Sequence, residues 1–414
     1  MEYCIQNGCT ISVNENASIE EFYAFEKSLK ADGYRRYFSS EMCENVFAGY
    51  EKDGRSVYFY FLARTRQLRV LEGDYAPLLS YEAGKRIRKT AVINFGFDFS
   101  QNPLTKEGSP LSQQGCGLGC VIILEDSSYV IIDGGAMHTD TDVVVEHLHD
   151  LLVSNNARTD GKIVIAAWMF THLHNDHCTT FERFSRKYGK TNRVEIKNLV
   201  YNYPWTWQML CFKEGLCTDT EVAPALDYIF KTCYDTPPTV YVPRTGHRFN
   251  LCGWEVEILS TYDEFFPNAI NRSNDASMVF RFNPKDLDGV NDSVLFLGDI
   301  EKEASELVVS LHGDYLKTKI VQVAHHGYMD GGSESLYRAI GAEHLIWPNS
   351  WIRWYGVENS KTGRVVPDWI KSAANTPPVA YPQCNEEQAA TDTYLTFDNG
   401  EIMVTTVTLP LNSL

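Results

Sequence analysis

The sequence lacks the features that mark a membrane-spanning or secreted protein. It has 414 residues, and none of its apolar runs reaches the roughly 18 residues needed to cross a bilayer. The N-terminal stretch has neither a basic start nor a long apolar core, so we expect no signal peptide there. The 11 cysteines include no C-x-x-C pair, which favours reduced thiols in a cytoplasmic protein over a disulfide framework.

Positive charge is also scarce. Lys and Arg number 37 against 54 Asp and Glu, which gives a formal net charge of -17. A surface of that sign repels phosphate backbones at long range, which argues against nucleic acid as a partner. Hydrophobic residues make up 44% and charged residues 22%, a composition typical of a soluble globular protein. The sequence gives no indication of an oligomeric state.

Two regions differ in their patterns. Residues 1–95 combine a helical pattern over 18–33 with strand-like runs at 46–52, 56–63 and 67–73. Ser18 and Glu21 have the spacing of a capping box, and Asp53-Gly54 separates two strand runs as a hairpin turn does. We expect a small α+β region of unknown role, or extra strands laid against the main domain.

Residues 96–414 form the second predicted region, in which apolar strands end in polar or glycine-rich loops followed by helical segments. The polar residues at these strand ends are Asp133, His172, His174, Asp176, His177, Asp299, His325 and His326. Strand ends hold side chains rigidly beside a loop, which is where α/β proteins place reactive groups. Histidine together with carboxylate suits zinc or another borderline divalent metal.

The stretch 172-HLHNDH-177 carries four possible ligands within six residues. Four donors are too many for one tetrahedral ion with an open position, so the spacing favours two ions. A single histidine is usually an ordinary surface or core residue. The H-x-H-x-D-H spacing, however, arises by chance in roughly fewer than one such chain in a thousand. We therefore expect a metal site rather than a set of unrelated histidines.

These motifs resemble those of the metallo-β-lactamase superfamily of hydrolases. The similar pieces are 131-IIDGG-135, 172-HLHNDH-177, 296-FLGD-299 and 323-VAHHG-327, within roughly residues 112–350. The metallo-hydrolase domain of competence (DNA-uptake) channel proteins and phosphorylcholine esterases look most similar, and 115-GCGLGCVIIL-124 and 274-NDASMVFRF-282 add to the likeness. The resemblance implies an α/β fold, a four-layer αββα sandwich, with two metal ions at one edge of the packed sheets.

The resemblance also implies a role for each motif residue. His172 and His174 would bind the first metal, Asp176 and His177 the second, and Asp299 would bridge them. One of His325 and His326 would complete the second site, and His325 is favoured because it follows the strand directly. Asp133 would accept a hydrogen bond from a ligand and fix its tautomer.

One departure from the family pattern affects the first metal. Many members have a further histidine between the second and fourth motifs, and here the only candidate is His247. Its apolar neighbours favour a strand residue over a ligand, in which case Asp275 or water would substitute. The residue after His-His-Gly, usually serine, is Tyr328.

Such a site predicts hydrolysis. Two divalent ions, most simply zinc with manganese or iron as alternatives, lower the pKa of a shared water, and Asp176 would orient the resulting hydroxide while it binds metal. Asp176 and Asp299 are therefore the candidate catalytic residues. A small phosphodiester or phosphoester is the expected substrate. A lactone, amide or thioester hydrolase, a nuclease, and a non-catalytic binding protein are the alternatives. Tyr203 and Trp205, in the aromatic stretch 201–210, and Tyr328 are candidates for the substrate pocket, as is the stretch 347–356.

Overall fold

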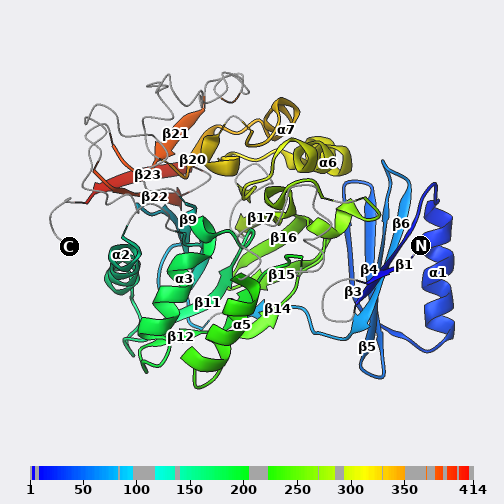
Figure 1. Cartoon of the computed structure of the whole chain (residues 1–414), viewed down its shortest axis with the longest axis horizontal. Coiled ribbons are helices and arrows are strands. Elements are labelled where there is room, and N and C mark those ends of the chain that lie inside the picture. The colour runs from blue at the N-terminus through cyan, green and yellow to red at the C-terminus, as the bar shows by residue number, and fades with distance from the viewer. Residues whose placement is uncertain are drawn as a thin grey trace.

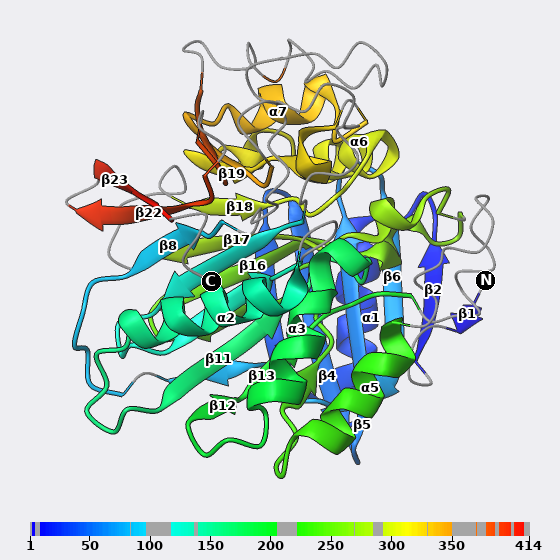
Figure 2. The ribbon, with the colours of Figure 1, turned by 60° about the vertical axis from the view of Figure 1, so that its left-hand side comes forward.

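The computed structural model describes residues 2–4, 9–82, 84–96, 117–135, 140–204, 222–268, 270–284, 293–328, 330–349, 370, 378–385, 389–398 and 401–409. These residues form a mixed α/β protein with three sheets, as Figures 1 and 2 show. The expectation of an α/β fold is confirmed. None of the helices in this part of the chain is long and apolar enough to cross a membrane.

The N-terminal residues form an antiparallel sheet of six strands. In spatial order these are β1 (Glu2–Cys4), β2 (Thr10–Asn14), β6 (Gln67–Asp74), β5 (Arg55–Leu62), β4 (Asn45–Lys52) and β3 (Arg35–Met42). The predicted turn joins β4 to β5, where Asp53 and Gly54 have φ angles of 52° and 79°. Helix α1 (Ile19–Ala31) begins with the predicted capping box of Ser18 and Glu21.

A second sheet has nine strands. Along its path lie β14 (Thr239–Tyr241), β13 (Asn198–Val200), β11 (Ile163–Met169), β10 (Tyr129–Asp133), β9 (Gly119–Ile123), β8 (Ala91–Asn94), β22 (Thr391–Asp398) and β23 (Glu401–Thr408), and β12 (Val194–Ile196) also pairs with β11. Strands β10, β11, β13 and β14 are parallel to one another. Their carboxyl ends therefore meet at one edge of the sheet.

The third sheet has eight strands. Their order is β21 (Val379–Pro382), β20 (His344–Trp347), β19 (Ile320–Gln322), β18 (Val294–Phe296), β17 (Val279–Pro284), β16 (Trp254–Ser260), β15 (Arg248–Leu251) and β7 (Ser80–Tyr81). Strands β18 to β21 are parallel. Strands β7 and β8 thus belong to the large sheets, although both fall within the region 1–95 that the sequence set apart.

The two large sheets pack face to face. Ile122 and Val130 of the nine-stranded sheet share a buried apolar cluster with Phe280 and Phe296 of the eight-stranded sheet. Helices cover the outer face of each sheet, because their apolar sides and those of the strands are buried together. On the nine-stranded sheet these helices are α2 (Thr141–Ser154), α3 (Asn175–Tyr188) and α5 (Val222–Cys233); on the other they are α6 (Lys302–His312) and α7 (Glu334–Ile340).

The six-stranded sheet is buried on both faces. Phe59 of β5 packs against Phe22 of α1, whereas Tyr60, which points the opposite way, packs in the same cluster as α6 and the eight-stranded sheet. Successive side chains of a strand alternate between faces, so one strand can serve both contacts. The N-terminal sheet is therefore a packed layer on the body of the protein.

Buried polar contacts fix this layer in place. The Arg69 guanidinium donates to the backbone oxygens of Asp263 and Glu264 at 2.8 and 2.9 Å, and Tyr60 Oη donates to Glu264 Oε1 at 2.7 Å. Asp263 and Glu264 lie in the 3-10 turn η4 (Tyr262–Phe265) that follows β16. Both sides of this contact are buried, so moving the six-stranded sheet away would break the hydrogen bonds and the ion pair that its charged groups make.

Candidate metal centre

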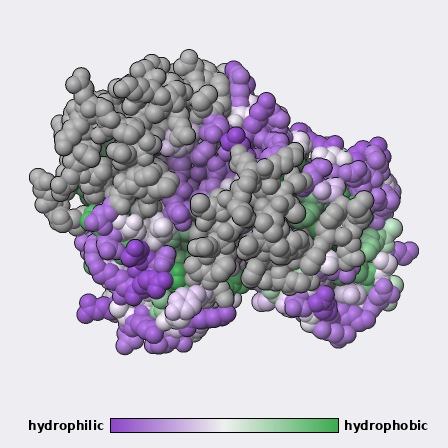
Figure 3. Space-filling view, in the orientation of Figure 1, coloured by the Kyte–Doolittle hydropathy of each residue, from purple (hydrophilic) through white to green (hydrophobic). Residues whose placement is uncertain are grey.

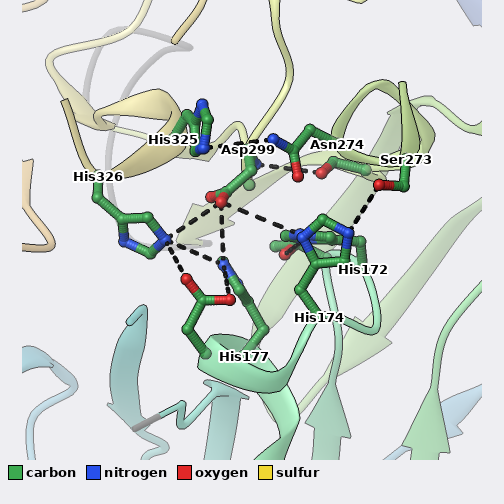
Figure 4. Close-up of polar contacts among 12 residues, drawn as sticks. His172, His174, His177, Ser273, Asn274, Asp299, His325 and His326 are labelled. Carbon is green, nitrogen blue, oxygen red and sulfur yellow. Dashed lines mark hydrogen bonds and ion pairs between the residues drawn. The ribbon is translucent and has the colours of Figure 1, made fainter. Parts of the chain in front are cut away.

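Four strand ends, two from each large sheet, bring the predicted site residues together. Strands β10 and β11 end at Asp133 and just before Thr171, and β18 and β19 end just before Asp299 and the turn η8 (Ala324–Gly327). The pairing of Ile132 with Met169 places the first two ends side by side. Figure 4 shows the side chains that converge between them.

Helix α3 presents two of these side chains. His174 is its N-cap residue, so Asp176 and His177 lie in the first turn, at the end nearest the strand tips. Gly135 permits this position, because a Cβ atom there would lie only 1.4 Å from the Asp176 backbone oxygen. The glycine after Asp133-Gly134 is thus required by the close approach of β10 to the helix.

A quartet of side chains, Asp176, His177, Asp299 and His326, forms the centre of the cluster. Asp299 Oδ2 lies 3.1 Å from both His177 Nε2 and His326 Nε2, and Asp176 Oδ2 lies 3.1 Å from His326 Nε2. All four residues are buried. A tetrahedral zinc ion with ligands at about 2.0–2.1 Å holds its ligand atoms roughly 3.3 Å apart, so the spacing of the quartet fits one such ion.

The two imidazoles of the quartet are oriented for this role. His177 Nδ1 lies 2.8 Å from Asp133 Oδ2, and His326 Nδ1 lies 3.2 Å from the Pro348 backbone oxygen. Both partners are acceptors, so each Nδ1 carries a proton and donates it. The two Nε2 atoms then face each other at 3.2 Å, an arrangement that suits two lone pairs directed at a shared cation.

Asp133 is itself fixed by the strand beside it. Thr171 donates its backbone N–H to Asp133 Oδ1 and its hydroxyl to Oδ2, each at 2.7 Å. The predicted part of Asp133, to accept a hydrogen bond from a ligand, agrees with this geometry. Thr171 was not singled out in the sequence. Its position directly before the first histidine of the motif was the available signal.

The first half of the motif lies beside His177, with the His172 and His177 ring centroids 4.1 Å apart, and across Asp299 from His326 (Figure 4). His172 Nε2 is 4.0 Å from Asp299 Oδ2, is fully buried, and has no hydrogen-bond partner among the described residues. The His174 ring packs against His172 with centroids 4.4 Å apart, and its Nε2 lies 2.8 Å from Ser273 Oγ. A buried imidazole nitrogen without a partner is costly, so His172 also fits a ligand. Asp299 Oδ2 is thus approached by an imidazole of each half, by His177 at 3.1 Å and by His172 at 4.0 Å.

The charges of the cluster favour cations. Burial opposes protonation of His177, but Asp299 and Asp133 outweigh it and raise the pKa of its imidazole to about 10. Burial likewise opposes protonation of His326, whose pKa Asp299 and Asp176 nevertheless raise well above its usual range. Without metal, the buried carboxylates keep protons on these rings, and the positive charge balances their own negative charge. A bound divalent cation would balance that negative charge in the same way.

His172 behaves in the opposite way. Burial lowers the pKa of its imidazole well below the usual range, and the neighbouring His177 and His174 add to the effect. A neutral imidazole is the form that donates a lone pair to a metal. The residues present therefore fit divalent metal ions on both sides of Asp299.

The structure brings His326, and not His325, into the quartet, which corrects the choice made from the sequence. Both residues have left-handed backbone conformations, with φ angles of 48° and 52°. Two such residues in succession turn the chain sharply after β19, so the nearer residue in sequence points away and the next one points inward. Extending the strand direction by one residue could not anticipate that turn.

His325 instead joins a second group beside the quartet. Its Nδ1 lies 2.9 Å from Asp330 Oδ1 and 3.9 Å from Glu301 Oε1. Asn274 donates its amide to Glu301 Oε1 at 2.9 Å and lies 3.3 Å from His325 Nε2. Arg272 Nη1 lies 2.8 Å from Glu301 Oε2. The sequence drew attention to the 274–282 segment but not to Glu301 or Asp330, because these residues are far apart in the chain and no local pattern signals their contact.

Two further candidates, His247 and Asp275, lie elsewhere. His247 is packed against the six-stranded sheet, with its ring 4.6 Å from that of Tyr58 and its Nδ1 2.8 Å from Tyr241 Oη. Asp275 Oδ1 accepts the backbone N–H groups of Glu301 and Ala304, at 2.8 and 3.2 Å, at the start of α6. The structure therefore places neither one with the quartet; the first is a core residue and the second caps a helix.

The aromatic candidates divide. Tyr328 lies beside the site, with its ring 5.1 Å from that of His325 and 6.2 Å from that of His326. Tyr203 is buried in the apolar cluster beneath α3 and α5, which favours packing over substrate contact. Trp205, with the rest of 205–210, and residues 350–356 lie outside the described residues.

Comparisons with known proteins leave the function to be argued from the site. No family model matches the sequence, and no curated protein matches it. Among solved structures, unliganded yeast PDE1 aligns with 57% of this chain and 76% of its own chain. The identity is 12% and the TM-score is 0.32.

Proposed function

We propose that the chain is a metal-dependent hydrolase that holds two divalent ions and acts on a small phosphodiester or phosphoester. The observation that carries the proposal is the buried quartet of Asp176, His177, Asp299 and His326, whose ligand atoms have the spacing of one metal ion. The buried Nε2 of His172, on the far side of Asp299, supports a second ion. We also assign the packed sheets to the metallo-β-lactamase architecture, on the sequence motifs and the position of the cluster at the sheet edge.

Each residue has a task under this proposal. His326, His177 and Asp176 would hold one ion, His172 and His174 would hold the other, and Asp299 would contribute to both. When bound, such a pair of ions lowers the pKa of water and draws charge from the ester under attack. Asp176, the most exposed of the four with 9% of its surface accessible, would orient the attacking water. Asp133 and Ser273 orient His177 and His174.

The surroundings favour a compact substrate with a cationic portion. A cavity of about 500 Å³ lies beside the second group, and its lining includes Glu301 and Asp330 as well as Arg272. Carboxylates outnumber basic residues there, five (Asp275, Glu301, Glu303, Asp330 and Glu334) against two (Arg272 and Lys302). On the face that Figure 3 shows, the described residues of α2, α6 and α7 are mostly hydrophilic. A polyanion approaching a chain of net charge -17 is repelled.

The test is a substrate panel on protein purified without a histidine tag. Bis-p-nitrophenyl phosphate, a phosphomonoester, nitrocefin, a lactone and a DNA oligonucleotide are compared with zinc or manganese added. We expect turnover of the small phosphodiester, little cleavage of DNA, and loss of turnover in Asp299→Asn with an unchanged circular dichroism spectrum. Turnover of the lactone or nitrocefin alone would show that the site hydrolyses carbonyl compounds and not phosphoesters. Rapid DNA cleavage that His174→Ala abolishes would restore the nuclease alternative, and failure of tag-free protein to bind either metal would refute the site.

A further inference from the structure

Among the described residues, the paths of the three sheets end in six strands, and five of these strands are protected against pairing with another chain. Strands β1, β7, β14 and β21 have only 3, 2, 3 and 4 residues, and β21 ends in Pro382. Strand β3 has 8 residues but carries Arg35, Arg36 and Glu41. Short length, proline and charge are the usual means by which proteins block an open sheet edge.

Strand β23 has none of these protections. It has 8 residues, EIMVTTVT, of which only the first is charged, and none of the described strands pairs with its second edge. β-branched residues such as Val404 and Val407 favour an extended strand. Figure 2 shows the β22–β23 hairpin, in red, at the margin of the molecule. An edge of this length and composition is a template for another strand.

The side chains of β23 are also exposed on both faces. Met403 is 55% exposed and Val407 is 44% exposed on one face, and Val404 is 36% exposed on the other. By contrast, the neighbouring β22 is buried at Leu395 and Phe397. Apolar side chains that a strand leaves exposed together mark a contact surface.

Charge decides what fits this edge. The whole chain has a net charge of -17, so two copies repel one another wherever their acidic surfaces meet. No residue from 402 to 408 is charged, so this segment is where two copies approach without repulsion. At physiological salt the Debye length is about 8 Å, which screens the more distant charges of each copy. A basic partner would be drawn to the acidic surface of the chain and not to this neutral strand in particular.

We propose that β23 pairs with β23 of a second copy, in antiparallel orientation about a twofold axis. Centring the axis on Thr405 places Met403 opposite the partner subunit's Val407, and Val407 opposite the partner subunit's Met403. The two exposed apolar residues of one face thus become two cross-strand pairs, with side chains about 4.5–5.5 Å apart. The nine-stranded sheet then runs continuously into that of the partner, and the edge amides and carbonyls of both strands are paired.

The first experiment measures mass as a function of concentration. Sedimentation velocity on the full chain, from about 1 µM to about 100 µM, should show a species of twice the 47.0 kDa chain mass. The double variant Met403→Lys/Val407→Lys places ammonium groups opposite each other, and we expect its dissociation constant to rise at least tenfold. Val379→Lys, a control at a 53% exposed valine on β21, should dimerise normally. The proposal would be overturned if the wild type stayed monomeric at every concentration. It would also be overturned if the double variant still dimerised, or if Val379→Lys did not dimerise.

The second experiment tests the register. Residues that face their own copy across an antiparallel pair have Cα atoms about 4.5–5.5 Å apart, within the range of a disulfide. Thr405→Cys should therefore form a disulfide-linked dimer under mild oxidation, visible on a non-reducing gel, whereas Val379→Cys and the unaltered chain should not. Equal cross-linking in all three, or none in Thr405→Cys, would overturn pairing about Thr405.

Discussion

The His177 imidazole lies between two aspartates, with Nδ1 2.8 Å from Asp133 Oδ2 and Nε2 3.1 Å from Asp299 Oδ2. The first contact sets the tautomer and the second brings the other nitrogen to the quartet. Because Asp133 also accepts two hydrogen bonds from Thr171, the ring is held by a strand end rather than by a flexible side chain. The affinity of the quartet for metal should therefore depend on a residue that does not bind it.

Asp133→Asn tests this dependence. The amide cannot accept from both Thr171 and His177 as the carboxylate does, so the His177 ring loses its fixed tautomer. We expect metal affinity to fall by about 10–100-fold while the fold is retained. Zinc titration in competition with a chromophoric chelator measures the affinity. Asp126→Asn is the matched control, since Asp126 is a buried aspartate that accepts from Ser128 in a hairpin turn. Equal affinities in the two variants would show that Asp133 plays no part.

The paired histidines after β19 offer a direct comparison. His326→Ala removes a nitrogen that lies 3.1 Å from both Asp176 and Asp299. His325→Ala leaves the quartet intact and opens only the contact with Asp330. We expect His326→Ala to lose at least ten times more metal affinity and turnover than His325→Ala. A reversed order would return the ligand role to His325.

The two ions should bind with unequal strength. Under the proposed assignment, the quartet would supply four ligands to one ion. The other would have His172, His174 and a share of Asp299, because His247 lies elsewhere. Dialysis against a mild chelator, followed by elemental analysis, should leave about one equivalent of metal per chain. His247→Ala should not change that number. Two equivalents that both survive dialysis would show that the first half has a ligand beyond these residues.

The sequence predicted in part which regular elements hold the site. Asp133 was predicted at the end of a strand, and β10 ends there. Asp176 and His177 were also predicted at a strand end, but they lie in the first turn of α3, and Asp299 lies three residues beyond the end of β18. The choice between His325 and His326 depended on two left-handed residues. Neither is a glycine or asparagine, the residues that usually signal such a turn, so the sequence carried no mark of it.

Contacts between distant segments were likewise beyond sequence reasoning. Ser273 reaches His174 across 99 residues, and Arg69 reaches Glu264 across 195. Only the packing of the two large sheets, and of the six-stranded sheet upon them, brings these residues together. The capping box and the Asp53-Gly54 turn are signalled within a few residues and were predicted correctly. The sequence also could not show whether residues 1–95 stand apart from the rest of the chain, because that depends on how the six-stranded sheet packs.

Acid should destabilise the protein through His247. Burial and the nearby Arg244 lower the pKa of this imidazole to about 3, so it is neutral in the folded chain. In the unfolded chain its pKa is about 6.5, so below that pH the unfolded state binds a proton that the folded state does not. The stabilisation is therefore complete above about pH 6.5 and is lost as the pH falls toward 3, by about 1.4 kcal/mol per pH unit.

His247→Gln isolates this contribution, since glutamine retains an acceptor for Tyr241 Oη but does not titrate. Other groups, such as Asp275, whose pKa burial raises to about 7, contribute equally to both chains and cancel in the difference. Urea unfolding at about pH 7 and about pH 5 should show the wild type losing about 2 kcal/mol relative to the variant on acidification. Above pH 7 the difference should be constant. A difference that does not change between pH 7 and pH 5 would mean that His247 accepts a proton in the folded chain, with its unpartnered Nε2 reached by water.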